Sequence, residues 1–156
     1  TTISTADRLF VYATKSQYIY FNNTPRRWAT LSSETNRAGN ITELELQGGD
    51  YFDEPSPRQR LYVGGPPVSF CVDGAGRLVR YSGYGWNETQ VRPPASAGTL
   101  IGEQLINLQP SGTQVPFRVD DATLLRNNII HVFLEYSSAS GEALYFNQEI
   151  QVPNAP

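Results

Sequence analysis

The twenty residues PPVSFCVDGAGRLVRYSGYG, numbered 66–85, contain the clearest hairpin signal in this chain. We predict a strand over 68–72, a turn over 73–76 and a returning strand over 77–81. The Asp-Gly pair tolerates a positive φ, and a second glycine two residues later eases the reversal, which is typical of a β-hairpin. Pro66 and Pro67 end any element that precedes this hairpin. We therefore expect the two strands of this hairpin to belong to an antiparallel sheet.

A second strand is predicted over 42–47, where polar and apolar residues alternate strictly (TELELQ). Successive side chains of an extended chain point to opposite faces. Leu44 and Leu46 should therefore share one face, and Glu43 and Glu45 the other.

Aromatic and β-branched residues predict two early strands, over 8–12 and 17–21, joined by a hairpin connection over 13–16. Residues 87–98 are rich in Pro, Ala, Ser and Gly and predict a loop. The one helix that we expect covers 99–108.

The C-terminal part of the sequence predicts a short strand over 117–119 and then a long hairpin. The hairpin has strands over 129–136 and 142–152 and a turn over 137–141. We therefore predict a mainly β fold, an antiparallel β-sheet structure with about seven to nine strands.

The length of 156 residues is that of one domain, so we expect residues 1–156 to form a single head domain. Hydrophobic residues make up 39% of the chain and charged residues 17%, which is typical of a globular protein. The net charge of -3 and the scattered basic residues argue against a nucleic-acid partner. The sequence has no Met and no run of about 18 apolar residues, so we expect an upstream segment with any anchor to be missing from it.

Residues for nucleophilic catalysis or zinc binding are scarce. The single histidine, His131, lies within the predicted strand NNIIHVFLEY, and we interpret it as a polar residue on a sheet face. The single cysteine, Cys71, is expected to be a small buried hydrophobe. The two could pair across the fold, but neither lies in a loop that would offer it to a substrate. One Cys and one His cannot supply the usual zinc ligands.

Carboxylates gather at three places without matching a known site. Asp50, Asp53 and Glu54 lie in the sequence GGDYFDE, and Asp120 and Asp121 are adjacent. Neither group has EF-hand spacing, so we interpret both as solvated loop acids. The third place is the strand face that Glu43 and Glu45 share, about 6.6 Å apart, but their regular alternation indicates an ordinary half-exposed strand. We predict no catalytic residue, no cofactor and no metal.

The aromatic residues Tyr18, Tyr20, Tyr81, Tyr84 and Trp86 leave two interpretations open. They could line a face that binds sugar or protein, or they could form cross-strand pairs with exposed hydroxyls, which we favour.

Four segments occur in a characteristic order: TADRLFVYAT, RLYVGGPPVSFCVDGAGRLVRYSGYG, DDATLLRNNIIHVFLEY and GEALYFNQEIQVPNAP. Together they resemble the periplasmic part of the MSHA-type minor pilins, the MshO group of the type IV pilin and pseudopilin superfamily. The family phrase P-V-[ST]-[YF]-x-C-[DN] is similar to residues 67–73, and L-x-R-Y-x-G-Y matches 78–84. The family ending H-x-V-H-V-x-N-x-P is similar to residues 148–156, with Gln148 and Gln151 in place of the histidines. Family members often carry a second cysteine where Val115 and Pro116 precede Phe117.

The resemblance implies a non-enzymatic subunit with an antiparallel β head and an N-terminal hydrophobic helix. Such prepilins lose a leader and are anchored in the bacterial inner membrane with the head in the periplasm, or are assembled into an extracellular pilus. The implied partners are other pilins of the fibre and the inner-membrane assembly machinery, with no nucleic acid and no small-molecule substrate. We expect Tyr84, Trp86 and Arg92 to contact a neighbouring subunit, because Tyr, Trp and Arg are typical interface anchors. The alternative function is that of an extracellular module that binds carbohydrate or a host surface.

Overall fold

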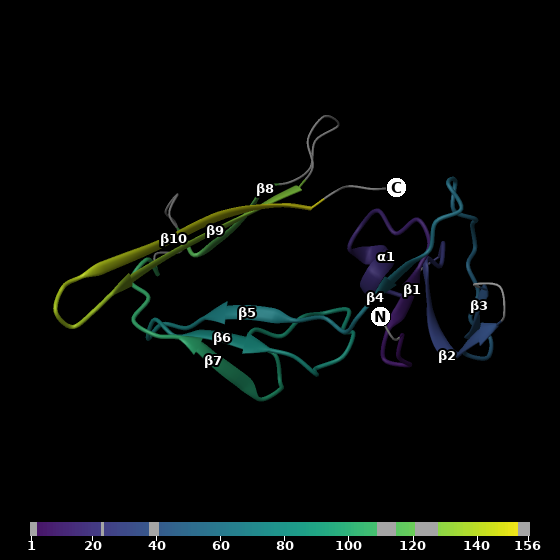
Figure 1. Ribbon diagram of the computed structural model, residues 1–156, viewed down its shortest axis with the longest axis horizontal. Helices are drawn as coiled ribbons and strands as arrows, with labels where there is room; N and C mark the ends of the chain where they lie inside the picture. The colour runs from purple at the N-terminus through teal and green to yellow at the C-terminus, as the bar shows by residue number, and fades with distance from the viewer. Residues whose placement is uncertain (1–2, 23, 38–40, 109–114, 121–127, 153–156) are drawn as a thin grey trace. The chain divides into compact units, whose positions relative to one another are not determined.

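The computed structural model describes residues 3–22, 24–37, 41–108, 115–120 and 128–152 (Figure 1). Within these ranges the chain forms ten strands in three antiparallel sheets and one helical turn. The predicted mainly β, antiparallel architecture is confirmed, while the number of strands exceeds the predicted seven to nine. No helix among these residues is long and apolar enough to cross a membrane.

The chain divides into two compact units, which are described separately. The first contains the described residues of 1–67 and 83–90, and the second those of 68–82 and 91–155. The expectation of a single domain over the whole chain stays a prediction.

The first unit is built on a four-stranded sheet in the order β3-β2-β1-β4. Its strands are β1 (Arg8–Phe10), β2 (Trp28–Arg37), β3 (Ile41–Leu46) and β4 (Tyr62–Gly64). The buried core lies around the central strand β1, where fully buried Leu9 faces Ala29 across the ladder to β2. Ala29 is fully buried as well, so this cross-strand pair forms part of the core of the first unit.

The alternation predicted for 42–47 is confirmed in β3. Leu44 and Leu46 are half-buried, whereas Glu43 and Glu45 are exposed. The strand β2 that pairs with β3 was not predicted. Its sequence, WATLSSETNR, is mostly polar in its second half, and its pairing with both β1 and β3 holds it extended.

The strand predicted over 17–21 is wrong, because these residues form the helical turn α1 (Gln17–Tyr20). The chain turns at Tyr12, with a φ of 53°, so β1 ends at Phe10 and residues 13–16 do not join two strands. The carbonyl oxygen of Ser16 accepts hydrogen bonds from the N–H groups of Ile19 and Tyr20. Arg8 Nη1 donates to the Ile19 carbonyl oxygen at 2.8 Å, which satisfies a helix-end acceptor. These contacts override the β propensity of the aromatic residues.

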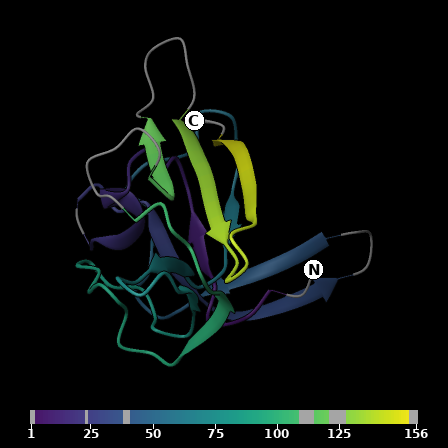
Figure 2. The same ribbon diagram turned by 90° about the vertical axis from the view of Figure 1, so that its left-hand side faces the viewer.

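The second unit contains two three-stranded sheets. One has the order β5-β6-β7, from strands β5 (Ser69–Val72), β6 (Leu78–Tyr81) and β7 (Gly98–Gly102). The other has the order β10-β9-β8, from β8 (Phe117–Asp120), β9 (Asn128–Ser137) and β10 (Ala143–Val152). Figure 2 shows β9 between β8 and β10. The core of the unit joins both sheets, since Leu78 of β6 packs with Leu105 and with Leu134 of β9.

The hairpin predicted in residues 66–85 is confirmed as β5 and β6. Asp73 Oδ1 accepts hydrogen bonds from the N–H groups of Ala75 and Arg77, and the Arg77 side chain pairs with Asp73 Oδ2 at 2.7 Å. Gly76 has a φ of +73°, and a Cβ placed there would lie 2.3 Å from the carbonyl oxygen of Leu105. Position 76 therefore needs glycine both for its backbone conformation and for space.

The helix predicted over 99–108 is wrong, because β7 pairs along β6 and Leu105 forms an isolated bridge with Tyr136. Gly98 lies close against Val79 and Tyr81, an approach that a larger side chain would prevent. The pairing with β6 and the β-branched residues of GTLIG outweigh any local helical preference. The strand predicted over 117–119 and the hairpin over 129–152 are confirmed, whereas β4 was not predicted.

Candidate interaction surfaces

Arginine and aromatic side chains alternate through the first unit. The Arg8 guanidinium lies 3.7 Å from the centroid of the Trp28 ring and 4.8 Å from that of Trp86. Arg26 lies 5.2 Å from the Trp28 ring and 5.8 Å from Tyr51. We call Tyr51, Arg26, Trp28, Arg8 and Trp86 the arginine–aromatic row. Each cation faces the negative side of a ring, which compensates part of the cost of removing the guanidinium groups from water.

Burial shifts the pKa of Arg8 in this row and that of the neighbouring Tyr20. Burial lowers the pKa of Arg8, an effect that the carboxylate of Asp50 opposes. Burial also raises the pKa of Tyr20. Tyr84 raises this pKa further, whereas the positive charge of Arg8 lowers it. Arg8 stays charged at neutral pH because an arginine titrates far above it.

The Trp86 end of the row is packed against its own unit and is not an open platform, whereas Tyr51 at the other end is exposed. The Trp86 indole N–H donates to the carbonyl oxygen of Ala6 at 3.2 Å, and the ring is half-buried. Its plane is tilted by 59° to Phe10 and by 49° to Tyr20. A flat aromatic face for sugar stacking would need rings that share a plane, and these rings do not.

The residues predicted as a subunit contact do not gather in one compact unit. Tyr84 and Trp86 belong to the first unit, both half-buried, whereas Arg92 belongs to the second and is exposed. The Asn87 side chain donates to the Tyr84 carbonyl oxygen at 3.0 Å, which fixes the local turn. Of the other aromatic residues singled out in the sequence, Tyr18 and Tyr20 are in the first unit and Tyr81 is in the second.

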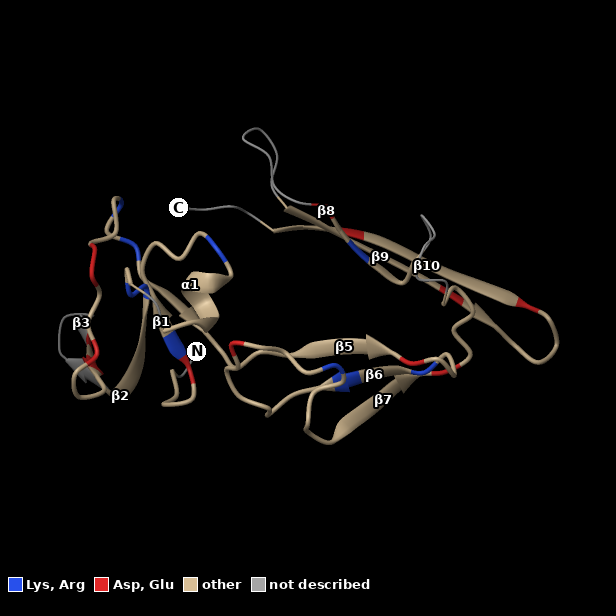
Figure 3. Cartoon of the chain, turned by 180° about the vertical axis from the view of Figure 1, so that it is seen from behind, with Lys and Arg blue, Asp and Glu red and all other residues tan. Residues whose placement is uncertain are grey.

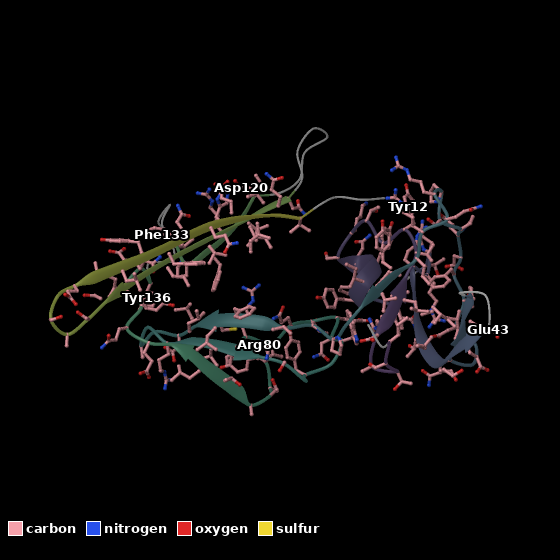
Figure 4. All side chains as sticks on the ribbon, in the orientation of Figure 1. Tyr12, Glu43, Arg80, Asp120, Phe133 and Tyr136 are labelled. Carbon is pink, nitrogen blue, oxygen red and sulfur yellow. The ribbon has the colours of Figure 1, made fainter. Side chains whose placement is uncertain are left out.

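Another arginine of the first unit, Arg27, is buried and lies near two tyrosine rings. Its guanidinium carbon is 4.8 Å from the centroid of the Tyr12 ring, which Figure 4 labels, and 5.7 Å from that of the Tyr18 ring. Arg27 is only 5% exposed and forms an ion pair with Glu54. Sequence reasoning missed this contact, because the two residues lie in different loops.

The acids of GGDYFDE were expected to be solvated, and this is wrong for Asp50. Its side chain is 13% exposed, pairs with Arg26 at 2.8 Å and accepts a hydrogen bond from the Thr30 N–H at 2.7 Å. Asp53 is exposed and accepts from the Arg26 backbone N–H. Two of the three carboxylates thus tie the loop to Arg26 and the third, that of Glu54, to Arg27. The interpretation as a solvated loop acid is also wrong for Asp120, which is a half-buried residue at the end of β8 and pairs with Arg118 at 3.3 Å, while Asp121 lies outside the described residues.

The interpretation of His131 as a polar residue on a sheet face is confirmed, and the residue lies in a row of ionisable side chains. Its Nε2 is 3.0 Å from Asp120 Oδ2 on β8, and its Nδ1 is 3.2 Å from Glu149 Oε1 on β10. Figure 4 labels Asp120 in this sheet. The two carboxylates approach opposite sides of the imidazole, so they do not converge on one point. Among the described residues, no three His, Cys, Asp or Glu side chains are placed to hold a metal ion.

Cys71 and Glu45 were also considered as site residues in the sequence, and they belong to different sheets. Cys71 is half-buried on β5, where it faces Val79, so the full burial expected of it is not reached. The exposed carboxylate of Glu45 accepts a hydrogen bond from the Ser33 hydroxyl at 2.8 Å. An open hollow of about 610 Å³ lies near the β9–β10 turn, and its one carboxylate is that of Glu142. Its lining residues are Gln104, Tyr136, Ser137, Ser138, Glu142, Ala143 and Leu144.

The most extended candidate surface is the strand β10. All ten of its residues are exposed, and within the described part of the chain it pairs only with β9, without a register shift from Ala143 to Val152. Four large apolar side chains lie on the same face of the strand, with exposed fractions from 40% to 68%: Leu144, Phe146, Ile150 and Val152. On the opposite face, the Tyr145 ring stacks on Phe133 at 6.3 Å. The sequence predicted this strand, but alternation alone does not reveal which strand lies at an edge.

The fold and these surfaces define a β-rich protein with three small antiparallel sheets. Compared with protein-family models, with characterised proteins and with solved structures, the chain shows no significant match to any of them.

Proposed function

We propose that this chain is the head of a non-enzymatic minor pilin subunit of the MSHA type. In this proposal the head takes part in assembly of a bacterial type IV pilus or a related pseudopilus. An N-terminal helix would anchor the subunit in the inner membrane, and other pilins would be its neighbours.

The observation that carries the proposal is the place of the resembling segments in the fold. The second of the four segments includes the β5–β6 hairpin, and the third and fourth form the β9–β10 hairpin. The first segment includes the central strand β1. The phrases that resemble the pilin family therefore include strands of all three antiparallel sheets, which supports the proposal.

The exposed surface is also of the kind that subunits use to contact each other. Large apolar side chains are exposed on β10 and also on β7, where Leu100 and Ile101 are each about half exposed. Specific interfaces are enriched in apolar and aromatic residues at their centres. Leu100 and Ile101 follow the predicted contact residue Arg92 along the chain.

The carbohydrate-binding alternative would need a flat aromatic platform. The tilted rings around Trp86 give it no support, and exposed Tyr145 stacks on Phe133 of its own sheet. Binding of the purified protein to a glycan array would favour the alternative over the pilin proposal.

Site-specific photo-crosslinking in the piliated bacterium tests the proposal. A photoreactive amino acid replaces Arg92 or Tyr84 in the full-length protein, and the products are identified by mass spectrometry. We expect products that contain other pilin subunits and that disappear when fibre assembly is blocked. Exposed Arg58 serves as the matched control position, outside the predicted contact. If neither Arg92 nor Tyr84 crosslinks to a pilin, or if Arg58 does so equally well, the proposal is wrong.

A further inference from the structure

The outer edge of β10 is long, and among the described residues no strand pairs with it. A strand at a sheet edge presents N–H and C=O groups that have no partner in the sheet, and proteins usually protect it with Lys, Pro, a bulge or a covering segment. The sequence of β10 is ALYFNQEIQV, which has neither Lys nor Pro, and its ladder to β9 contains no bulge. Glu149 is the single charged residue of the strand, so most of β10 is tan in Figure 3.

The other edge strands among the described residues are shorter. The edge strands β4, β5, β7 and β8 have three to five residues each, and β3 has six with two exposed glutamates. A short edge strand, or one that carries charged side chains, pairs poorly with a strand from another molecule. The ten residues of β10 therefore form the edge best suited to pairing with another strand.

The side chains of β10 are complementary to a second, antiparallel copy of the same strand. In a register centred on Gln148, Leu144 faces Val152 and Phe146 faces Ile150. The four apolar residues of each copy then share one face of the paired strands, on both sides of the two opposed Gln148 side chains at its centre, because directly opposed residues in an antiparallel pair share a face. A shift by one residue would place Phe146 opposite Glu149 and would break this match.

Charge favours the same register. The carboxylate of Glu149 would face the neutral side chain of Asn147 in the other copy, so no like charges lie directly opposite each other. On the face of the strands that carries Glu149, Tyr145 of one copy would lie opposite Gln151 of the other, and both side chains could remain in contact with solvent.

We propose that β10 pairs antiparallel with β10 of a second copy of this chain, about a two-fold axis at Gln148. The result is a six-stranded sheet in the order β8-β9-β10-β10-β9-β8. A two-fold contact of this type uses the same surface on both copies and closes on itself. This proposal does not depend on the pilin assignment.

The dimer should be weak, because one pair of strands buries less than the roughly 1,600 Å² of a standard interface. Sedimentation equilibrium over about 1–500 µM should show a monomer–dimer equilibrium in the micromolar range. Phe146→Lys should weaken the dimer at least about tenfold, because a lysine at the edge would face Ile150 of the partner copy. Val119→Lys is the matched control: Val119 is 61% exposed on the same face, but on the short strand β8.

Disulfide trapping tests the register, in a Cys71→Ser background that removes the single native thiol. Gln148→Cys should give an intermolecular disulfide under mild oxidation, since the two copies of position 148 face each other about 5 Å apart at Cβ. Gln151→Cys is the control, because its copies would lie about 20 Å apart in this register. The trapping experiment remains informative even if Phe146→Lys impairs folding.

Three results would overturn the proposal. They are a monomer at every concentration, an equal loss of dimer with Val119→Lys, and crosslinking of Gln151→Cys as fast as that of Gln148→Cys. If the purified protein does not form this dimer, the expected crosslinks to pilins in the bacterium are unaffected. The dimer proposal and the pilin proposal can therefore be disproved separately.

Discussion

The N–H of Leu105 donates a hydrogen bond of 3.0 Å to the carbonyl oxygen of Gly76. The turn of the first predicted hairpin is thereby fixed to the residue at the centre of the core of the second unit. Leu105 also bridges to Tyr136 of β9, so a single residue connects the hairpin turn with the other sheet.

Gly76→Ala should destabilise the second unit by about 2–4 kcal/mol, because alanine resists the positive φ and its Cβ would overlap the Leu105 carbonyl oxygen. Thermal unfolding followed by circular dichroism measures the loss. Gly74→Ala is the matched control in the same turn, where a Cβ meets nothing within 4 Å and the φ is not positive. It should change stability by less than about 1 kcal/mol, and equal losses for both variants would contradict the argument.

Leu105→Ala should cost about 2–5 kcal/mol, because it opens a cavity between Leu78 and Leu134. Its neighbour Ile106 provides the control, since it is 50% exposed whereas Leu105 is 2% exposed. Ile106→Ala should therefore cost much less in the same unfolding measurement. If the two substitutions cost the same, Leu105 is not the residue that joins the two sheets.

Arg8→Lys should destabilise the first unit by about 1–3 kcal/mol, because an ammonium group cannot lie flat on Trp28 and also donate to the Ile19 carbonyl oxygen. Both tryptophans of the chain are in the first unit, so urea unfolding followed by tryptophan fluorescence reports on that unit. Exposed Arg58→Lys serves as the control and should stay within about 0.5 kcal/mol of the wild type. A loss of similar size from Arg58→Lys would show that the effect is not specific to the row.

The pKa of Asp73 should lie below the ordinary aspartate value in an NMR titration. Hydrogen bonds from the Arg77 backbone lower it most, and the Arg77 side chain and Ala75 N–H lower it further. Because the folded-state pKa is depressed, the stabilising effect is present above the unfolded pKa of about 3.9 and is lost as the pH falls through the folded value.

Asp73→Asn should therefore lower the urea midpoint more at pH 7 than at pH 2. In Arg77→Gln the pKa of Asp73 should rise only part of the way to its ordinary value, since the backbone donors remain. An Asp73 pKa at the ordinary value in the wild type would contradict this prediction.

Local sequence patterns predicted the elements whose partners are close along the chain. The hairpin turn at Asp73, the alternation around Leu44 and the β9–β10 hairpin each carry their signal within a few residues. Residues 17–21 and 99–108 were assigned wrongly because their conformations depend on Arg8 and on β6, which are distant in sequence.

The candidate surfaces were predictable to a smaller extent. Sequence reasoning singled out Trp86 as an expected subunit contact, but its contacts with Arg8 and Phe10 join segments far apart in the chain and had no local signal. It also treated Asp50 as a solvated acid, since the pairing with Arg26 has no local signature. The exposed edge of β10 follows from the strand order, which no single strand encodes.

Trp86 lies in residues 83–90, which belong to the first unit. These residues follow the β5–β6 hairpin, which belongs to the second unit. Within the described ranges the backbone therefore crosses between the units three times, and neither unit is a continuous piece of sequence. A fragment that stops at Pro67 would leave one face of the Arg8 guanidinium without its indole. Dissecting this protein into independently folding halves would require a permuted or re-joined chain, not a single truncation.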